Sequence, residues 1–272
     1  MVKVNLKSIK RLVIFGCSYT AGCELLDHTL EEGFGDLKKS IDIWSWFLEI
    51  HKNERIFQQL LNNREKEKYL AWPGKLSNNL NLEILSYAFC GNSNERMLWE
   101  IEDKIYRNII SDTDLILVGI TSPFRSMNFD NSSEEPIPFL LTDQDYIKKN
   151  FSEHIHNYFN DSRIVWNYIR DLEHFLHLKK RLNNRLFLVF MERPGFLDQN
   201  LYWNLDDLGK QYDFFKFKVK QLTESDLFLS SKEFLLNDCG EMDVLPHRHP
   251  KEEIHQQFAN TLSKYFQKSA NN

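Results

Sequence analysis

The chain has 272 residues, which is enough for one large α/β domain or two small ones. Hydrophobic residues make up 42% of it and aromatic residues 14%, so it can bury a sizeable core that is rich in aromatic packing. Its net charge of −5 argues against nucleic acid or an anionic membrane as a partner, because either would need a concentrated basic surface.

No run approaches the roughly 18 consecutive apolar residues of a membrane span, and residues 1–7 lack the apolar region of a signal peptide. Cys17, Cys23, Cys90 and Cys239 are widely scattered and form no CxxC pair. These features predict reduced thiols and a cytoplasmic location. Association with a phage particle, reached without a signal peptide, is the open alternative.

Apolar runs that indicate buried parallel strands recur along the chain. They cover residues 12–15, 82–88, 115–120 and 186–191, with a weaker fifth run at 226–229. Helical patterns separate them and include 98–109, 164–182 and a last helix that opens at Pro250. This alternation predicts an α/β fold with a doubly wound parallel sheet of about five strands.

No internal repeat or low-complexity linker divides the chain, so residues 1–272 are interpreted as a single domain with two insertions. Residues 23–71 are charged and mostly helical in pattern, and residues 126–160 are acidic, aromatic and irregular. Each insertion is either a lid over a site or surface decoration. Residues 215–220 alternate apolar residues with lysines, which favours an edge strand with lysines facing water, and polymer binding is the alternative.

The most informative segment is Phe15–Gly22, where the first predicted strand opens directly into a Gly-rich turn. A serine on such a turn can present its hydroxyl at the carboxyl edge of a parallel sheet, where ligands bind. Ser18, Gly91 and Thr121 each follow a predicted strand closely. We therefore expect these three residues to line one edge of the sheet.

The blocks around these residues resemble those of the SGNH (GDSL-like) hydrolases, and in particular members from bacteria and phages. The resemblance rests on Gly16-Cys17-Ser18-Tyr19-Thr20, Gly91, Gly119-Ile120-Thr121-Ser122 and His247-Arg248-His249-Pro250, which follow the family's order along nearly the whole chain. The family comprises serine esterases, lipases, deacetylases and thioesterases. The resemblance implies a flavodoxin-like three-layer α/β/α sandwich.

By this resemblance Ser18 is the nucleophile and His249 the general base, which later acts as the general acid. A serine hydroxyl is weak until a base removes its proton, and an imidazole with a pKa near 6.5 suits both steps. The structural alternatives are a turn serine that caps the following helix and a histidine that caps the last helix. Cys17 replaces the aspartate of the first block, and we expect it to pack inward rather than to react.

The residue that orients His249 is open, because the usual acid of the last block is absent. Asp238, Glu241 and Asp243 precede it, and Asp243 is the best placed of the three. A backbone carbonyl is another partner. His247 would supply an acceptor without charge, and it is also a candidate substrate contact.

The oxyanion hole is predicted to combine the backbone N–H groups of Ser18 and Gly91 with one side-chain donor. Thr121 stands where the family has an asparagine, and Asn94 is the other candidate donor, with a helix cap as its alternative role. Arg125 either holds an anionic group of the substrate or forms a structural ion pair.

Together these features predict a serine hydrolase for a carbohydrate O-acetyl or short-chain acyl ester, with a small-molecule or glycan ester as substrate and no cofactor. The alternatives are a catalytically degenerate binding or structural module and an acyltransferase. A metal site built from His247, His249, His255 and Asp243 is disfavoured, because the six-residue step from His249 to His255 does not match helical i,i+4 ligand spacing.

Overall fold

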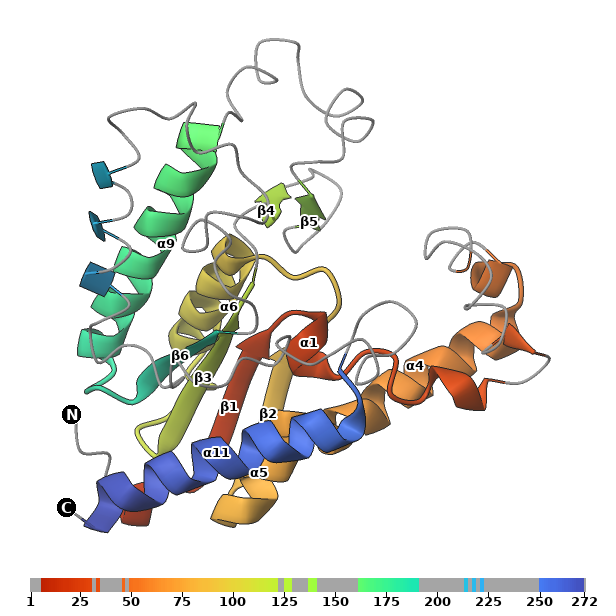
Figure 1. Cartoon of the computed structure of the whole chain (residues 1–272), viewed down its shortest axis with the longest axis horizontal. Helices are drawn as coiled ribbons and strands as arrows, with labels where there is room; N and C mark the ends of the chain where they lie inside the picture. The colour runs from red at the N-terminus through yellow and green to blue at the C-terminus, as the bar shows by residue number, and fades with distance from the viewer. Residues whose placement is uncertain are drawn as a thin grey trace.

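The structure is a computed structural model that describes residues 6–30, 33–34, 46, 49–121, 125–128, 137–140, 161–190, 213–214, 217–218, 221–222 and 250–271. The strands are β1 (Arg11–Gly16), β2 (Glu83–Ala88), β3 (Asp114–Ile120), β4 (Arg125–Asn128), β5 (Ile137–Leu140) and β6 (Leu186–Phe190). The α-helices are α1 (Ser18–Ala21), α4 (Glu54–Leu70), α5 (Trp72–Leu80), α6 (Asn94–Tyr106), α9 (Asp161–Arg181) and α11 (Glu252–Asn271), and the 3-10 helices are η1 (Leu6–Ser8) and η2 (Asp27–Thr29). The predicted alternation of strands and helices is confirmed (Figure 1).

The main sheet is parallel and has the strand order β2-β1-β3-β6. In its centre, Gly16 of β1 pairs with Ala88 of β2 on one side and with Gly119 of β3 on the other. An order in which the first strand lies between the second and the third is the flavodoxin-like, doubly wound arrangement. The predicted fold class is therefore confirmed. The sheet has four strands in the described part of the chain, and the weaker fifth run at 226–229 lies outside that part.

Helices cover both faces of this sheet, with α6 and α9 on one face and α5 and α11 on the other (Figure 1). Successive strand residues point to opposite faces, so each strand contributes to two separate apolar cores. The first core contains Val13, Phe15, Ile116, Val118, Leu186 and Leu188 against helix residues such as Met97, Ile101, Ile169 and Phe175. The second contains Leu12, Ile14, Leu115, Leu117, Phe187 and Val189 against Trp72, Leu76, Phe258 and Phe266.

Helix α4 lies in the segment between β1 and β2 that was predicted to be mostly helical. Its N-cap is Asn53, whose side chain accepts a hydrogen bond from the backbone N–H of Ile56 at 3.3 Å. A third, smaller core forms on this helix. It contains Leu30, Trp46, Ile50, Ile56 and Leu60.

Two segments differ from the local sequence pattern. Phe217 and Lys218 are helical, so the edge strand expected over 215–220 is wrong at these residues. Within 126–160, β5 pairs antiparallel with β4, which adds regular structure to a segment that was expected to be irregular.

None of the helices that the structure describes combines the length and apolarity that a bilayer crossing requires.

Candidate functional site

The carboxyl edge of the sheet gathers the segments that follow β1, β2 and β3. The three parallel strands end side by side, because the last residue of β1, Gly16, pairs with Ala88 at the end of β2 and with Gly119 near the end of β3. The residues that follow the strands therefore meet at one edge. Ser18 comes two residues after β1, Gly91 three residues after β2 and Thr121 directly after β3. The expected grouping of these segments at one edge follows from this register.

Ser18 occupies the first position of α1, on the turn that leaves β1, and is only 5% exposed. Cys17 is the N-cap residue, and its carbonyl oxygen accepts hydrogen bonds from the N–H groups of Thr20 at 3.0 Å and Ala21 at 2.9 Å. The Cys17 side chain is fully buried in the second core, which confirms its inward packing. A Cβ atom on Gly16 would lie 2.3 Å from Thr20 Oγ1, so this tight turn requires glycine.

Gly91 lies in the loop between β2 and α6 and has a φ of +86°, a backbone conformation that favours glycine. Its neighbour Asn92 is fully buried, and the Asn92 Nδ2 group donates to the carbonyl oxygen of Gly16 at 3.2 Å. The backbone N–H of Phe89 donates to the same oxygen at 3.2 Å. The Gly91 loop is therefore bonded to the end of β1. This contact of Asn92 is not predicted by the sequence motifs.

Asn94 and Thr121 form a reciprocal pair of hydrogen bonds between the Gly91 loop and the end of β3. Asn94 Nδ2 donates to the Thr121 carbonyl oxygen at 3.0 Å, and the Thr121 N–H donates to Asn94 Oδ1 at 3.0 Å. The cap of α6 is Ser93, whose hydroxyl accepts from the N–H of Arg96, so the capping role considered for Asn94 is wrong. Thr121 is 2% exposed, and its hydroxyl has no hydrogen-bond partner among the described residues.

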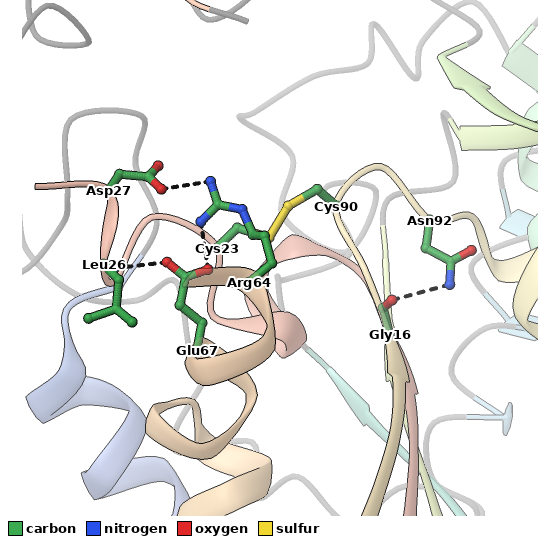
Figure 2. Close-up of a disulfide and its surroundings, with 8 residues drawn as sticks. All are labelled: Gly16, Cys23, Leu26, Asp27, Arg64, Glu67, Cys90 and Asn92. Atoms are coloured by element: carbon green, nitrogen blue, oxygen red, sulfur yellow. Dashed lines mark hydrogen bonds and ion pairs between the residues drawn. A yellow bond between two sulfur atoms is a disulfide. The ribbon is translucent and has the colours of Figure 1, made fainter. Parts of the chain in front are cut away.

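A disulfide joins Cys23 to Cys90 beside this edge (Figure 2), with their Cα atoms 6.7 Å apart. The prediction of reduced thiols, on which the cytoplasmic location partly depended, is therefore wrong for these two cysteines. Their separation of 67 residues hid the pairing in the sequence. A signal was nevertheless present, because Cys90 directly precedes Gly91 and Cys23 follows Ser18 by five residues, in segments predicted to share one edge.

A buried polar network links helix α4 to the segment that comes directly after α1 (Figure 2). Arg64 bonds Glu67 at 2.5 Å and Asp27 at 2.7 Å, and Glu67 Oε1 accepts from the N–H of Leu26 at 2.8 Å. Burial raises the pKa of Glu67 to about 7, although Arg64 and the Leu26 N–H act in the opposite direction. The network fixes the path of the chain between α1 and η2.

The first turn of α11 is held close to α1 through α5. His255 is fully buried, and its Nδ1 atom accepts a hydrogen bond from the backbone N–H of Trp72 at 3.1 Å. A neutral His255 ring therefore carries its proton on Nε2. At the C-cap of α1, a Cβ atom on Gly22 would lie 2.7 Å from the Cβ of Ala71. Pro250, just before α11, is buried.

Three predicted site residues, His247, His249 and Asp243, lie outside the described residues. Arg125 begins β4, and its backbone pairs with Leu140. Over the described ranges, the structure holds no group of three or more His, Cys, Asp and Glu side chains that could bind a metal ion.

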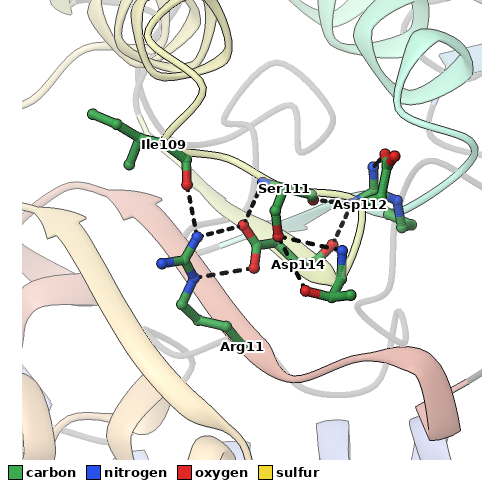
Figure 3. Close-up of polar contacts among 7 residues, drawn as sticks. Arg11, Ile109, Ser111, Asp112 and Asp114 are labelled. Atoms are coloured by element: carbon green, nitrogen blue, oxygen red, sulfur yellow. Dashed lines mark hydrogen bonds and ion pairs between the residues drawn. The ribbon is translucent and has the colours of Figure 1, made fainter.

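A second buried polar cluster lies at the amino edge of the sheet, at the opposite ends of the strands (Figure 3). Asp114 of β3 is 1% exposed and accepts from Arg11 Nε at 3.0 Å and Nη2 at 2.7 Å. Arg11 Nη2 also donates to the Ile109 carbonyl oxygen, and the N–H of Ser111 donates to Asp114. This cluster joins β1 to β3 without contacting the candidate site.

Comparison with known proteins found solved structures that match nearly the whole chain at low sequence identity. The esterase EstA from Pseudoalteromonas sp. is 10% identical, with a TM-score of 0.49, and the match covers 97% of this chain and all of EstA. A carbohydrate esterase, whose active site is described as having divergent catalytic and non-catalytic binding functions, is 13% identical with a TM-score of 0.46 over 98% of this chain and 67% of its own. The lipase Lip_vut3 from a goat rumen metagenome is 12% identical with a TM-score of 0.41, and the match covers 96% of this chain and 97% of the lipase.

No family model matches the chain, and no curated protein matches it. The fold and the edge residues define an α/β sandwich with a serine on the turn after its first strand. In the order of its sequence blocks and in its strand order, the chain resembles the SGNH (GDSL-like) hydrolases.

Proposed function

We propose that the chain is a serine hydrolase that cleaves an ester through an acyl-enzyme intermediate. The observation that carries this proposal is the position of Ser18, on a sharp strand-to-helix turn whose edge it shares with Gly91 and Thr121. The resemblance of the sequence blocks supplies the matching histidine near the other end of the chain. The anchoring of the first turn of α11 near α1 also supports the proposal, since His249 precedes that helix by only a few residues.

In the proposed mechanism, Ser18 Oγ attacks the ester carbonyl carbon while His249 takes the hydroxyl proton. The C–O bond to the leaving alcohol then breaks, and His249 gives the proton to that oxygen. Water, activated by the same imidazole, hydrolyses the acyl-enzyme and restores Ser18. Asp243 is the proposed partner that orients His249.

The tetrahedral intermediate carries a negative oxygen, for which the proposed donors are the N–H groups of Ser18 and Gly91 and one side chain. Thr121 is the better candidate for the side-chain donor, because its buried hydroxyl has no partner among the described residues. The Asn94 amide, in contrast, is bonded through both its oxygen and its nitrogen to the backbone of Thr121.

The proposed substrate is a carbohydrate O-acetyl or short-chain acyl ester, on the resemblance of the sequence blocks. Arg125 is proposed to hold an anionic group of the substrate, and His247 is proposed as a further substrate contact. We further propose that residues 1–272 act as one domain, with 23–71 and 126–160 as insertions.

Labelling with a fluorophosphonate probe, which forms a covalent bond with an activated serine, tests the proposal. Wild-type protein should be labelled on the peptide that contains Ser18, and Ser18→Ala should not be labelled. Ser111→Ala, at the amino edge of the sheet, is the matched control and should be labelled like the wild type. Failure to label the folded wild type, or equal labelling of Ser18→Ala, would refute the nucleophile and favour a degenerate binding module. Product analysis with and without a sugar acceptor separates hydrolysis from acyl transfer.

A further inference from the structure

The N–H group of Gly91 belongs to the peptide bond between Cys90 and Gly91, so its direction depends on how the neighbours of Gly91 are held. Gly91 is exposed, and no described atom lies within 4 Å of the place where its Cβ would be. The glycine therefore lacks side-chain packing of its own that would fix this peptide.

Both neighbours of Gly91 are anchored to the segment that carries Ser18. On one side, Cys90 forms the disulfide with Cys23, and the Cys23 N–H donates to the carbonyl oxygen of Ser18 at 3.1 Å. On the other side, the Asn92 side chain donates to the carbonyl oxygen of Gly16 at 3.2 Å. One anchor is a covalent bond and the other a hydrogen bond, and together they flank a single glycine.

We propose that the Cys23–Cys90 disulfide is a positioning element that fixes the Gly91 N–H relative to Ser18. This inference deepens the proposed function and rests on it for its catalytic consequence. If the disulfide is broken, Cys90 loses its link to the Ser18 segment. The loop then keeps the hydrogen bonds of Phe89 and Asn92, and the Gly91 peptide between them can rotate or shift. A displacement of about 1 Å in a catalytic constellation can cost about 100-fold in rate, and loss of one oxyanion donor costs about 100- to 1,000-fold in kcat.

We expect a thiol reductant to reach the bond from the side of Cys90, because Cys90 is an exposed residue, whereas Cys23 is 3% exposed. A dithiol such as dithiothreitol supplies two electrons and two protons: the S–S bond breaks, Cys23 and Cys90 become thiols, and the reagent becomes its cyclic disulfide. Removal of the reductant and addition of oxidised glutathione reverses the change.

The test compares three forms of the full chain with p-nitrophenyl acetate as the ester: oxidised wild type, wild type reduced with dithiothreitol, and the Cys23→Ser/Cys90→Ser double variant. Circular dichroism confirms that each form is folded at the assay temperature. In the reduced and double-variant proteins, we expect kcat to fall about 10- to 100-fold while KM changes less than about threefold. The double variant should not respond to dithiothreitol, and reoxidation should restore the wild type.

Hydrogen exchange of the peptide over residues 89–93 gives a readout that does not depend on activity. Exchange there should rise on reduction more than exchange in β1 or β3. An unchanged kcat, a change in KM alone, a loss explained by unfolding, or unchanged exchange over 89–93 would overturn the inference. If exchange rises but even the oxidised protein neither hydrolyses esters nor reacts with fluorophosphonate, the positioning stands and the proposed function fails.

Discussion

Arg64 of α4 neutralises two buried carboxylates, and replacing it with methionine tests how much this network stabilises the fold. The side chains of Asp27 and Glu67 are 4% and 0% exposed, and Arg64 itself is 22% exposed. Methionine retains an apolar stem of similar length but leaves both carboxyl groups without their cation. Removal of one partner from a buried ion pair commonly costs about 3–5 kcal/mol. We expect Arg64→Met to lower the free energy of unfolding by about 3 kcal/mol at pH 8.

The effect should depend on pH in a defined direction. Burial raises the pKa of Glu67 in the folded state to about 7, above its ordinary value of about 4.5. The contribution of this protonated carboxyl to stability is therefore present below about pH 4.5 and is lost as the pH rises through 7. Arg64 lowers this pKa, and its removal will raise it further. At pH 5 the Glu67 carboxyl is then neutral in the folded state of both proteins. The cost of Arg64→Met should therefore be smaller at pH 5 than at pH 8.

Urea denaturation at pH 5 and pH 8 measures both quantities. The matched control is Arg107→Met, because Arg107, at the C-terminal end of α6, pairs with Asp103 of the same helix at 2.7 Å but is 63% exposed. An exposed pair of this kind contributes about 0.2–1 kcal/mol. Equal costs for the two variants at pH 8, or a cost of Arg64→Met that does not shrink at pH 5, would refute the reasoning.

Two further substitutions test other buried carboxylates. Asp114→Asn should lower the free energy of unfolding by about 3 kcal/mol, because it removes the charge that Arg11 binds at the amino edge. Its folded form should react with fluorophosphonate at the wild-type rate, and a slower reaction would contradict the separation of the two edges. Burial also raises the pKa of Asp171 in α9 to about 7, so wild-type stability should fall as the pH rises from about 4 to 7. Denaturation at pH 5 and 8 should show a smaller fall for Asp171→Asn, and equal falls would contradict this cause.

Strands β1, β3 and β6 of the main sheet could be predicted from the sequence because they are buried on both faces. Such strands appear as continuous apolar runs, and the runs at 12–15, 115–120 and 186–191 end within one residue of the observed strands. The turn at Ser18 could also be predicted, since Gly16 stands where Thr20 leaves no space for a side chain.

Contacts between distant segments could not be predicted from local patterns. The alternation at 215–220 resembles an edge strand, but Phe214 stacks on Trp166 of α9 with ring centroids 6.5 Å apart, and Lys218 pairs with Glu173 at 3.2 Å. Such tertiary contacts outweigh the preference for a strand that comes from six residues of alternating apolar and lysine side chains.

The role of Asn94 was hidden for a different reason. Its partner is the backbone of Thr121, and every residue type other than proline offers the same N–H and carbonyl groups. The contact with Asn94 therefore cannot be predicted from the residue type at position 121. Only the pairing of β1 with both β2 and β3 brings the two segments together.

The division of the sheet into two apolar cores has a consequence for how the protein tolerates substitutions. Adjacent residues of β3, such as Ile116 and Leu117, pack into different cores that share only the backbone between them. Energetic coupling between substitutions requires contact or shared neighbours, so changes in opposite cores should add independently. Volume lost from one core can be regained only by its own members, and the two halves of the interior can diverge in evolution along separate paths.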